Sequence, residues 1–286
     1  MLHVSFGALV SLVIIMLICF VLPFLLFYFL YRFADGRVKT FLIGAAAYLV
    51  CGIIADTTIS ALLEQLGKIN GSGGLYLLYA VVLSPACFIL LNYVIIKRFG
   101  ADHMKTTGDS LMYSVGYSTA LNLLSTGFVA VMYFITLRDI RDRSGSYQIV
   151  SDADYVSASN AVSASNLVNE SVYHDMVKLC SEPISYYIVF IINCLWSIAV
   201  FAAIMPVIWL AVKKQNKPII LVFAVIIRLF ITLPDLLNRF HAVNNQWVLQ
   251  LIMLAILVIV WVAAIYCRRL FIDTEDAVWE DNQKKK

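Results

Sequence analysis

The chain has 286 residues, of which 62% are hydrophobic and only 14% are charged, and its mean hydropathy is +0.86. A chain this apolar cannot bury its hydrophobic side chains in one core and still present a polar surface, so the composition excludes an ordinary soluble enzyme. The net charge of +3 is small. We therefore expect the lipid bilayer as a partner and no nucleic acid.

Seven apolar stretches are long enough to cross a bilayer. A helix needs about 20 such residues to span a hydrocarbon core of ~30 Å, and the stretches show no sustained alternation typical of strands. We predict an all-α fold, a polytopic transmembrane helical bundle that forms one domain over residues 1–286. The predicted spans are 4–31, 40–63, 75–97, 110–137, 184–212, 218–238 and 247–267.

Lysine and arginine are unevenly distributed between the connecting segments. Fourteen of the 21 lie in or beside the first, third and fifth connections and in the tail 268–286, whereas six lie in the connections of the other side. Basic residues accumulate in cytoplasmic loops. We therefore predict an outside N-terminus and a cytoplasmic C-terminus, with the tail solvated near the inner leaflet.

The outer loop 138–183 is the longest predicted connection, and it carries seven acidic and four basic residues. It contains a short tandem repeat, Ser157-Ala-Ser-Asn-Ala-Val followed by Ser163-Ala-Ser-Asn-Leu-Val. Apolar residues at 156, 161, 162, 167 and 168 allow a helix lying on the bundle, and a partly ordered connector is the alternative. Loops longer than ~15 residues are more often functional or disordered than incidental.

Ionisable residues within the predicted spans suggest function, because burying a charge in a membrane is unfavourable. Arg228 lies near the middle of span six, Asp235 follows it at i+7 on the same helix face, and Asp56 lies in span two. These three residues form either an anion site or charge-coupled pathway built on Arg228, or a structural ion pair that fixes helix packing. The structural ion pair is the favoured interpretation.

Span four carries a polar face. Ser114, Ser118, Asn122 and Ser125 are spaced so that they share one side of a helix, and Tyr117 lies beside them. Polar side chains commonly join membrane helices, although the same residues would suit a substrate cavity. We expect Asn92 in span three and Asn193 in span five to face this side.

The chain lacks the common catalytic signatures, including HExxH, GxSxG and GxGxxG. Its four histidines fall outside the predicted spans or at their edges. A catalytic zinc normally needs three protein ligands and a water, and only Asp56 and Asp235 are available within the membrane. Five of the six cysteines lie in apolar stretches, and we expect no disulfide framework.

Four segments carry a resemblance to a known family. They are Leu75-Tyr-Leu-Leu-Tyr-Ala before a helix ending at Lys97-Arg98, Gly108-Asp-Ser-Leu-Met-Tyr-Ser-Val-Gly116, Glu182-Pro183, and Leu233-Pro234-Asp235. In this order, over most of the chain, they resemble the YhfC family of intramembrane metalloproteases, distant relatives of the CAAX-protease and bacteriocin-processing group. The resemblance implies a multi-pass protein in a bacterial plasma membrane.

The motifs of active members differ from this sequence. Active members have a Glu-Glu-x-x-Arg motif in the third span and Gly-His-Gly followed by a glutamate in the fourth. Hydrolysis by an activated water needs both a metal and an acid or base. The resemblance therefore implies the fold of the family without its activity, and we assign no catalytic residue and no metal ligand. The residues that align with the motifs are Ser84, Pro85 and Phe88, then Gly116-Tyr117-Ser118 and Leu121, with Phe190 to Asn193, Arg228 to Ile231 and Asp235 in the later spans.

Three functions are compatible with the sequence. The first is a non-catalytic binding or scaffold protein without a cofactor, which holds a membrane-embedded peptide or protein partner in a cavity lined by Tyr117, Ser118 and Asn122. The second is an active zinc peptidase with a rearranged site, such as Asp56, Asp235 and His241. The third is a small transporter or channel that uses Arg228 for an anionic solute. We favour the first.

Overall fold

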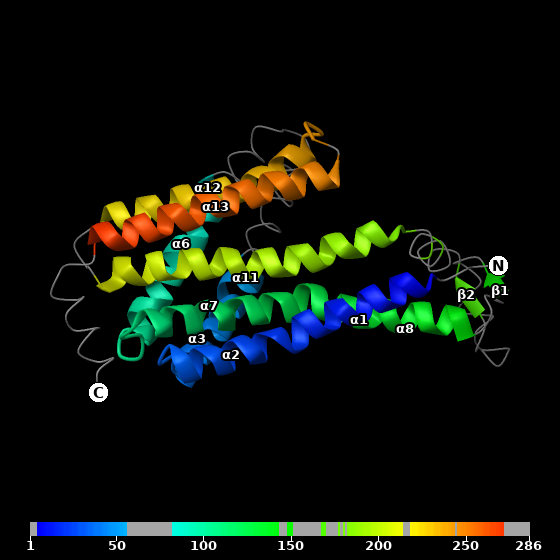
Figure 1. The fold of residues 1–286 in the computed structure, drawn as a ribbon, viewed down its shortest axis with the longest axis horizontal. Coiled ribbons are helices and arrows are strands. Elements are labelled where there is room, and N and C mark those ends of the chain that lie inside the picture. The colour runs from blue at the N-terminus through cyan, green and yellow to red at the C-terminus, as the bar shows by residue number, and fades with distance from the viewer. Residues whose placement is uncertain are drawn as a thin grey trace. The chain divides into compact units, whose positions relative to one another are not determined.

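The computed structural model describes residues 5–55, 82–142, 148–150, 167–169, 177, 180, 182–213, 218–243 and 245–271, and helices make up nearly all of them (Figure 1). The predicted all-α membrane fold is confirmed, because five helices in these ranges are long and apolar enough to cross a membrane. They are Phe6–Phe33, Thr107–Arg141, Ile184–Lys213, Pro218–Asn238 and Gln246–Arg269.

These five helices coincide with predicted spans one, four, five, six and seven. Span two begins as α3 (Val38–Tyr48) and continues as the π-helix η1 (Leu49–Ala55), and its remainder lies outside the described residues. Span three is seen from residue 82 onward, as α6 (Ser84–Ile95) followed by the π-helix η3 (Ile96–Gly100). Seven spans, a single domain and an outside N-terminus stay predictions.

Large apolar side chains are exposed along the outer faces of the helices. On α13 (Gln246–Phe271), Leu251 is 66% exposed, Val262 62% and Tyr266 60%. Soluble monomers rarely expose continuous apolar surfaces of this kind. Lipid chains are the surroundings that such a surface requires, so the exposed faces agree with the helix lengths in placing the chain in a bilayer.

The chain divides into two compact units. Unit 1 comprises residues 1–21 and 123–194, with α1 (Phe6–Phe20), most of the π-helix η4 (Asn122–Gly127), α8 (Phe128–Asp142) and the first turns of α11 (Ile184–Lys213). Its core contains Leu12, Ile15, Leu137 and Tyr187. Gly7 of α1 lies so close to Ile184 of α11 that a Cβ there would approach its side chain to 2.6 Å.

Unit 1 also contains two short parallel strands, β1 (Gln148–Val150) and β2 (Leu167–Asn169), in which Gln148 pairs with Leu167. The prediction of a helix in the outer loop is therefore wrong at 167–169. Leu167 and Val168 of the second repeat copy instead belong to a strand, which suits apolar and β-branched residues. The first repeat copy lies outside the described residues.

Unit 2 comprises residues 22–122 and 195–286, and it contains the polar helix of predicted span four. Its elements are α2 (Leu22–Phe33), α3, α6, α7 (Thr107–Leu121), the remainder of α11, α12 (Pro218–Arg239) and α13. α12 and α13 lie side by side (Figure 1). Ile204 and Ile208 of α11 are fully buried in a core with Ile89 of α6 and Ile256 of α13.

Glycines bring α7 unusually close to α3 and to Ala34, which follows α2. A Cβ at Gly44 of α3 would collide with the backbone oxygen of Tyr113, and a Cβ at Gly116 of α7 would collide with that of Phe41. Gly108, two turns before Gly116, meets the backbone oxygen of Ala34 in the same way. Small residues allow such backbone contact between membrane helices. α7 is consequently buried on every side over most of its length.

Candidate functional site around α7

The N-terminus of α7 is built on a buried carboxylate. Thr106 is the N-cap, its side chain accepts from the Asp109 backbone N–H at 3.1 Å, and Asp109 accepts in return from the Thr106 backbone N–H at 3.2 Å. This reciprocal pair is a capping box. Asp109 also accepts from the backbone N–H groups of Arg37 at 3.0 Å and Lys105 at 2.9 Å, and it is fully buried.

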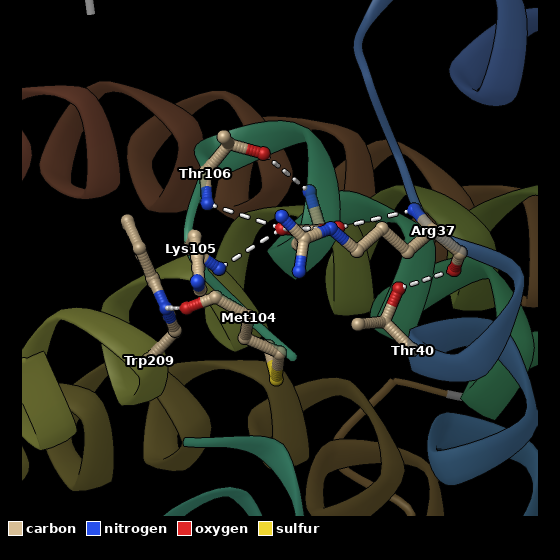
Figure 2. A network of polar contacts seen from close by, with 7 residues as sticks. Arg37, Thr40, Met104, Lys105, Thr106 and Trp209 are labelled. Carbon is tan, nitrogen blue, oxygen red and sulfur yellow. Dashed lines mark hydrogen bonds and ion pairs between the residues drawn. The ribbon is translucent and has the colours of Figure 1, made fainter. Parts of the chain in front are cut away.

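These hydrogen bonds join two connecting segments at one end of unit 2. Figure 2 shows Arg37 approaching from one segment, and Lys105 and Thr106 from the other. The guanidinium Nε of Arg37 lies 4.0 Å from Asp109 Oδ2, and Trp209 of α11 donates to the Met104 backbone oxygen at 2.9 Å. The first and third predicted connections therefore meet at the same end of unit 2.

The polar face of α7 is hydrogen-bonded throughout. Ser114 donates to the Ser110 backbone oxygen and Ser118 to that of Val115, so both hydroxyls are satisfied within the helix. Tyr113 donates to Asn92 Oδ1 of α6 at 2.7 Å, and Asn92 donates to the Phe88 backbone oxygen. Asn122 accepts from Ser197 of α11 at 2.7 Å. Tyr113 and Asn122 thus join α7 to two neighbouring helices.

Two members of the predicted polar group lie elsewhere. Ser125 is exposed and its hydroxyl lies 3.3 Å from that of Thr126. It follows the start of η4, and the extra residue in a π-helical turn rotates later side chains by about 100° relative to an α-helix. Asn193 is exposed on the part of α11 that belongs to unit 1.

Tyr117 stands in a cluster of aromatic rings. Its ring centroid lies 4.7 Å from that of Phe201, 5.4 Å from Tyr48 and 5.7 Å from Phe88, and Tyr117 is only 2% exposed. The pairs with Tyr48 and Phe88 are edge-to-face, which is a geometry that aromatic quadrupoles favour. The guanidinium of Arg228 lies 4.8 Å from the Phe88 centroid. This cation–π contact is worth about 0.5–2 kcal/mol, depending on desolvation.

The predicted intramembrane charges are only partly placed. Arg228 is half-buried in α12, and its contact with Phe88 gives the charge an aromatic neighbour. Asp235 belongs to the same helix, but its side chain lies outside the described residues, as does all of Asp56. His241 is exposed in the turn after α12, with a left-handed φ of 54°.

The described residues do not fit a metal site. No three His, Cys, Asp or Glu side chains within the described ranges lie together in a way that could hold a metal ion. At the centre of the α7 site, the groups that face one another are phenyl and phenol rings, a guanidinium and hydroxyls bonded to backbone oxygens. Zinc is held by imidazole, thiolate and carboxylate groups.

Two cavities are lined by described residues, one in each unit. One, of about 130 Å³, lies in unit 2 between α7, α11 and α13, with Pro206, Trp261 and Arg268 in its wall. The other, of about 490 Å³, lies in unit 1 between α1 and α8. Tyr117, Ser118 and Asn122 line neither of them, and each is 2% exposed or less.

Sequence reasoning missed several residues on which this arrangement depends. The buried carboxylate of Asp109 was not singled out, although Thr106-x-x-Asp109 before an apolar helix is a recognisable variant of the capping box. Ser197 and Phe201 gave no signal, because a serine and a phenylalanine in an apolar span are ordinary. Their importance comes from the packing of α11 against α7 and α6.

The membrane-length helices and their exposed apolar faces define a multi-pass α-helical membrane protein. A family model described as YhfC intramembrane metalloprotease matches residues 18–253, well over half of the chain. The chain belongs to this family, as the sequence resemblance indicated. No curated protein and no solved structure matches it.

Proposed function

We propose that this protein is a non-catalytic member of the YhfC family that binds a membrane-embedded peptide or protein partner without cleaving it. The observation that carries this proposal is the aromatic cluster around Tyr117. In the sequence resemblance described above, Tyr117 corresponds to the histidine of the Gly-His-Gly motif, and Phe88 corresponds to a position of the Glu-Glu-x-x-Arg motif. Here the two residues form an edge-to-face ring pair with centroids 5.7 Å apart.

The chemistry of these groups opposes water activation. Leu121, which aligns near the glutamate of the family motif, has no proton to transfer. The guanidinium of Arg228 keeps its positive charge at any physiological pH. A fixed cation 4.8 Å from the Phe88 ring raises the electrostatic cost of placing a divalent cation beside it. At the positions aligned with the third-span motif and the fourth-span glutamate, Phe88 and Leu121 carry no group that could transfer a proton in general acid–base catalysis.

The groups at the edge of the cluster suit a binding role. Phe88 and Arg228 are half-buried, whereas Tyr117 is almost fully enclosed. A partner would therefore contact the edge of the cluster and reach Tyr117 only by displacing rings. Phe88 offers an apolar face, and a guanidinium donates in a planar geometry that suits a carboxylate or a backbone carbonyl.

We place the protein in the plasma membrane of a bacterium.

Site-specific photocrosslinking in the native membrane tests the proposed binding. A benzophenone amino acid at position 88 should capture a defined partner, whereas the same probe at Leu90, 53% exposed on the same helix, should capture lipid. Arg228→Gln should abolish the specific adduct, and Arg228→Lys should retain part of it. Equal adducts at both positions, or an adduct insensitive to Arg228→Gln, would contradict the proposal.

Family membership favours a second function, intramembrane peptide hydrolysis. It would draw its ligands from Asp56, Asp235 and His241, of which only the exposed His241 has a described side chain. We expect purified protein to contain zinc well below one atom per chain, and the Asp56→Ala/Asp235→Ala variant to leave that content unchanged. About one zinc per chain, lost in the variant together with peptide cleavage, would replace the binding role with hydrolysis.

A further inference from the structure

A groove of about 490 Å³ runs along unit 1 between α1 and α8. Its α1 wall is the stripe Phe6, Leu9, Val10, Val13 and Ile14, whose spacing of three and four residues places all five on one helix face. Its α8 wall is formed by Phe134, Arg138 and Arg141, which follow one another at i, i+4 and i+7. The volume falls in the range of about 300–1,000 Å³ that is typical of ligand sites.

The groove is charged at one end and apolar at the other. The guanidinium of Arg141 lies 6.0 Å from the Phe6 ring centroid, so the end of α8 meets the beginning of α1. From Phe6 to Ile14 the helix rises about 12 Å, at 1.5 Å per residue. Valine and isoleucine line the far end, and Asp139, which lies between the two arginines in sequence, is not part of the wall.

We propose that this groove binds one anionic phospholipid, with its phosphate between Arg138 and Arg141 and an acyl chain along the α1 stripe. The groove has two cations beside an apolar channel. A phospholipid has an anionic phosphate beside an apolar acyl chain, so its groups match those of the groove in charge and in order. The residues of both walls belong to the continuous helices Phe6–Phe33 and Thr107–Arg141, each long enough to span a membrane, and Phe6 (70% exposed) and Val10 (40%) open the groove towards the lipid phase. Arginines at the end of a membrane helix lie at headgroup depth.

Selectivity for an anionic headgroup follows from charge. Arg138 and Arg141 line the wall together, and none of the described residues that line it carries a carboxylate. A zwitterionic headgroup carries a positive charge close to its phosphate. That charge is repelled by the two guanidinium groups, so the zwitterionic lipid binds less favourably. Each cation near an anionic membrane surface contributes about a fivefold preference, which gives a preference of about 25-fold for the pair. This inference does not depend on the proposed function, because every residue in it belongs to unit 1.

The test uses the full chain in nanodiscs of phosphatidylcholine, with photoactivatable phosphatidylglycerol or phosphatidylcholine of equal chain length added at physiological ionic strength. Phosphatidylglycerol should be captured in preference, with adducts on peptides that contain residues 6–14 or 134–141. Arg138→Gln/Arg141→Gln should lower its apparent affinity about 25-fold. The control Arg268→Gln/Arg269→Gln, which removes the same charge elsewhere, should leave the affinity unchanged.

A second variant tests the apolar end without changing charge. Val10→Trp should fill the groove and reduce capture of both lipids, and it keeps the test available if the double arginine variant does not fold. Equal capture of the two lipids by the wild-type protein would overturn the proposal. So would an equal loss in the control variant, adducts outside the groove, or a co-purifying peptide segment cross-linked in the lipid's place.

Discussion

Removing the carboxylate of Asp109 should destabilise unit 2 more than any other single loss of charge that the described contacts suggest. Its two oxygens accept from the backbone N–H groups of Arg37, Lys105 and Thr106, at 3.0, 2.9 and 3.2 Å. Asp109→Ala leaves all three donors without their acceptor. Asp109→Asn keeps one oxygen but places an N–H₂ group against at least one of the donors.

The expected magnitudes follow from the cost of unsatisfied donors. Each buried donor left without a partner costs about 1–3 kcal/mol. Water reaches part of the network, because the Lys105 side chain is exposed, so we expect Asp109→Ala to lower the free energy of unfolding by about 3–6 kcal/mol. Asp109→Asn should lower it by about 1–3 kcal/mol. At about 2–4 °C per kcal/mol, the alanine variant should lose about 6–24 °C in Tm.

Thermal unfolding in detergent, followed by the reaction of a thiol dye with the buried Cys51 and Cys267, measures these differences. Asp102→Asn is the matched control, because Asp102 is an exposed aspartate of the same connecting segment. It should change Tm by no more than 1–2 °C. If Asp109→Ala behaves like this control, the carboxylate does not hold the two segments together and the reasoning fails.

Three further predictions follow from other contacts. Tyr113→Phe should cost about 1–2 kcal/mol by leaving Asn92 Oδ1 without its donor, whereas adding Asn92→Leu should cost less than the sum of the single variants in a double-mutant cycle. A membrane-permeant oxidant should join Cys19 to Cys194, whose sulfurs lie 3.6 Å apart, as the two thiols give up two protons and two electrons to it. Burial raises the pKa of the Cys180 thiol, so alkylation of Cys180 by iodoacetamide should reach its half-maximal rate at higher pH than that of an unstructured cysteine.

Each of these expectations has a measurement that would contradict it. Additive losses in the Tyr113–Asn92 cycle would mean that the two side chains do not interact. Peptide mapping that finds Cys19 and Cys194 both free after oxidation, while other cysteines pair, would exclude their contact in unit 1. Only the thiolate reacts with iodoacetamide, so a half-maximal rate at or below about pH 8.5 would show that Cys180 is not desolvated.

Long apolar stretches made most of the helices predictable from sequence. A single apolar run as long as 184–212 must form a helix in a bilayer, because only a helix satisfies the backbone N–H and C=O groups within the same segment. The strand at Leu167–Asn169 was not predictable, because its partner Gln148–Val150 lies about twenty residues away and neither segment alternates clearly. The π-helical segments after Tyr48 and Ile95 also gave no signal, since an extra residue in one turn leaves the composition unchanged.

The candidate site was predictable as a set of residues, but their partners were not. The spacing of Ser114, Ser118 and Asn122 identifies a polar helix face from sequence alone. Whether that face lines a cavity or joins helices depends on what lies opposite. Ser197 and Asn92 lie far from one another in sequence, and only the packing of α11 and α6 brings each to α7.

Gly44 of α3 and Gly116 of α7 allow these two helices to touch through their backbones, and this contact affects the order in which the helices assemble. α3 is synthesised before α6, yet its closest neighbour is α7, which leaves the ribosome last of the three. Until residues 107–121 enter the bilayer, the surface of α3 around Gly44 lacks the helix that it contacts in the folded protein. The insertion of α7 therefore completes this helix pair, and a chain interrupted before Gly116 would leave that surface of α3 without the helix that packs against it.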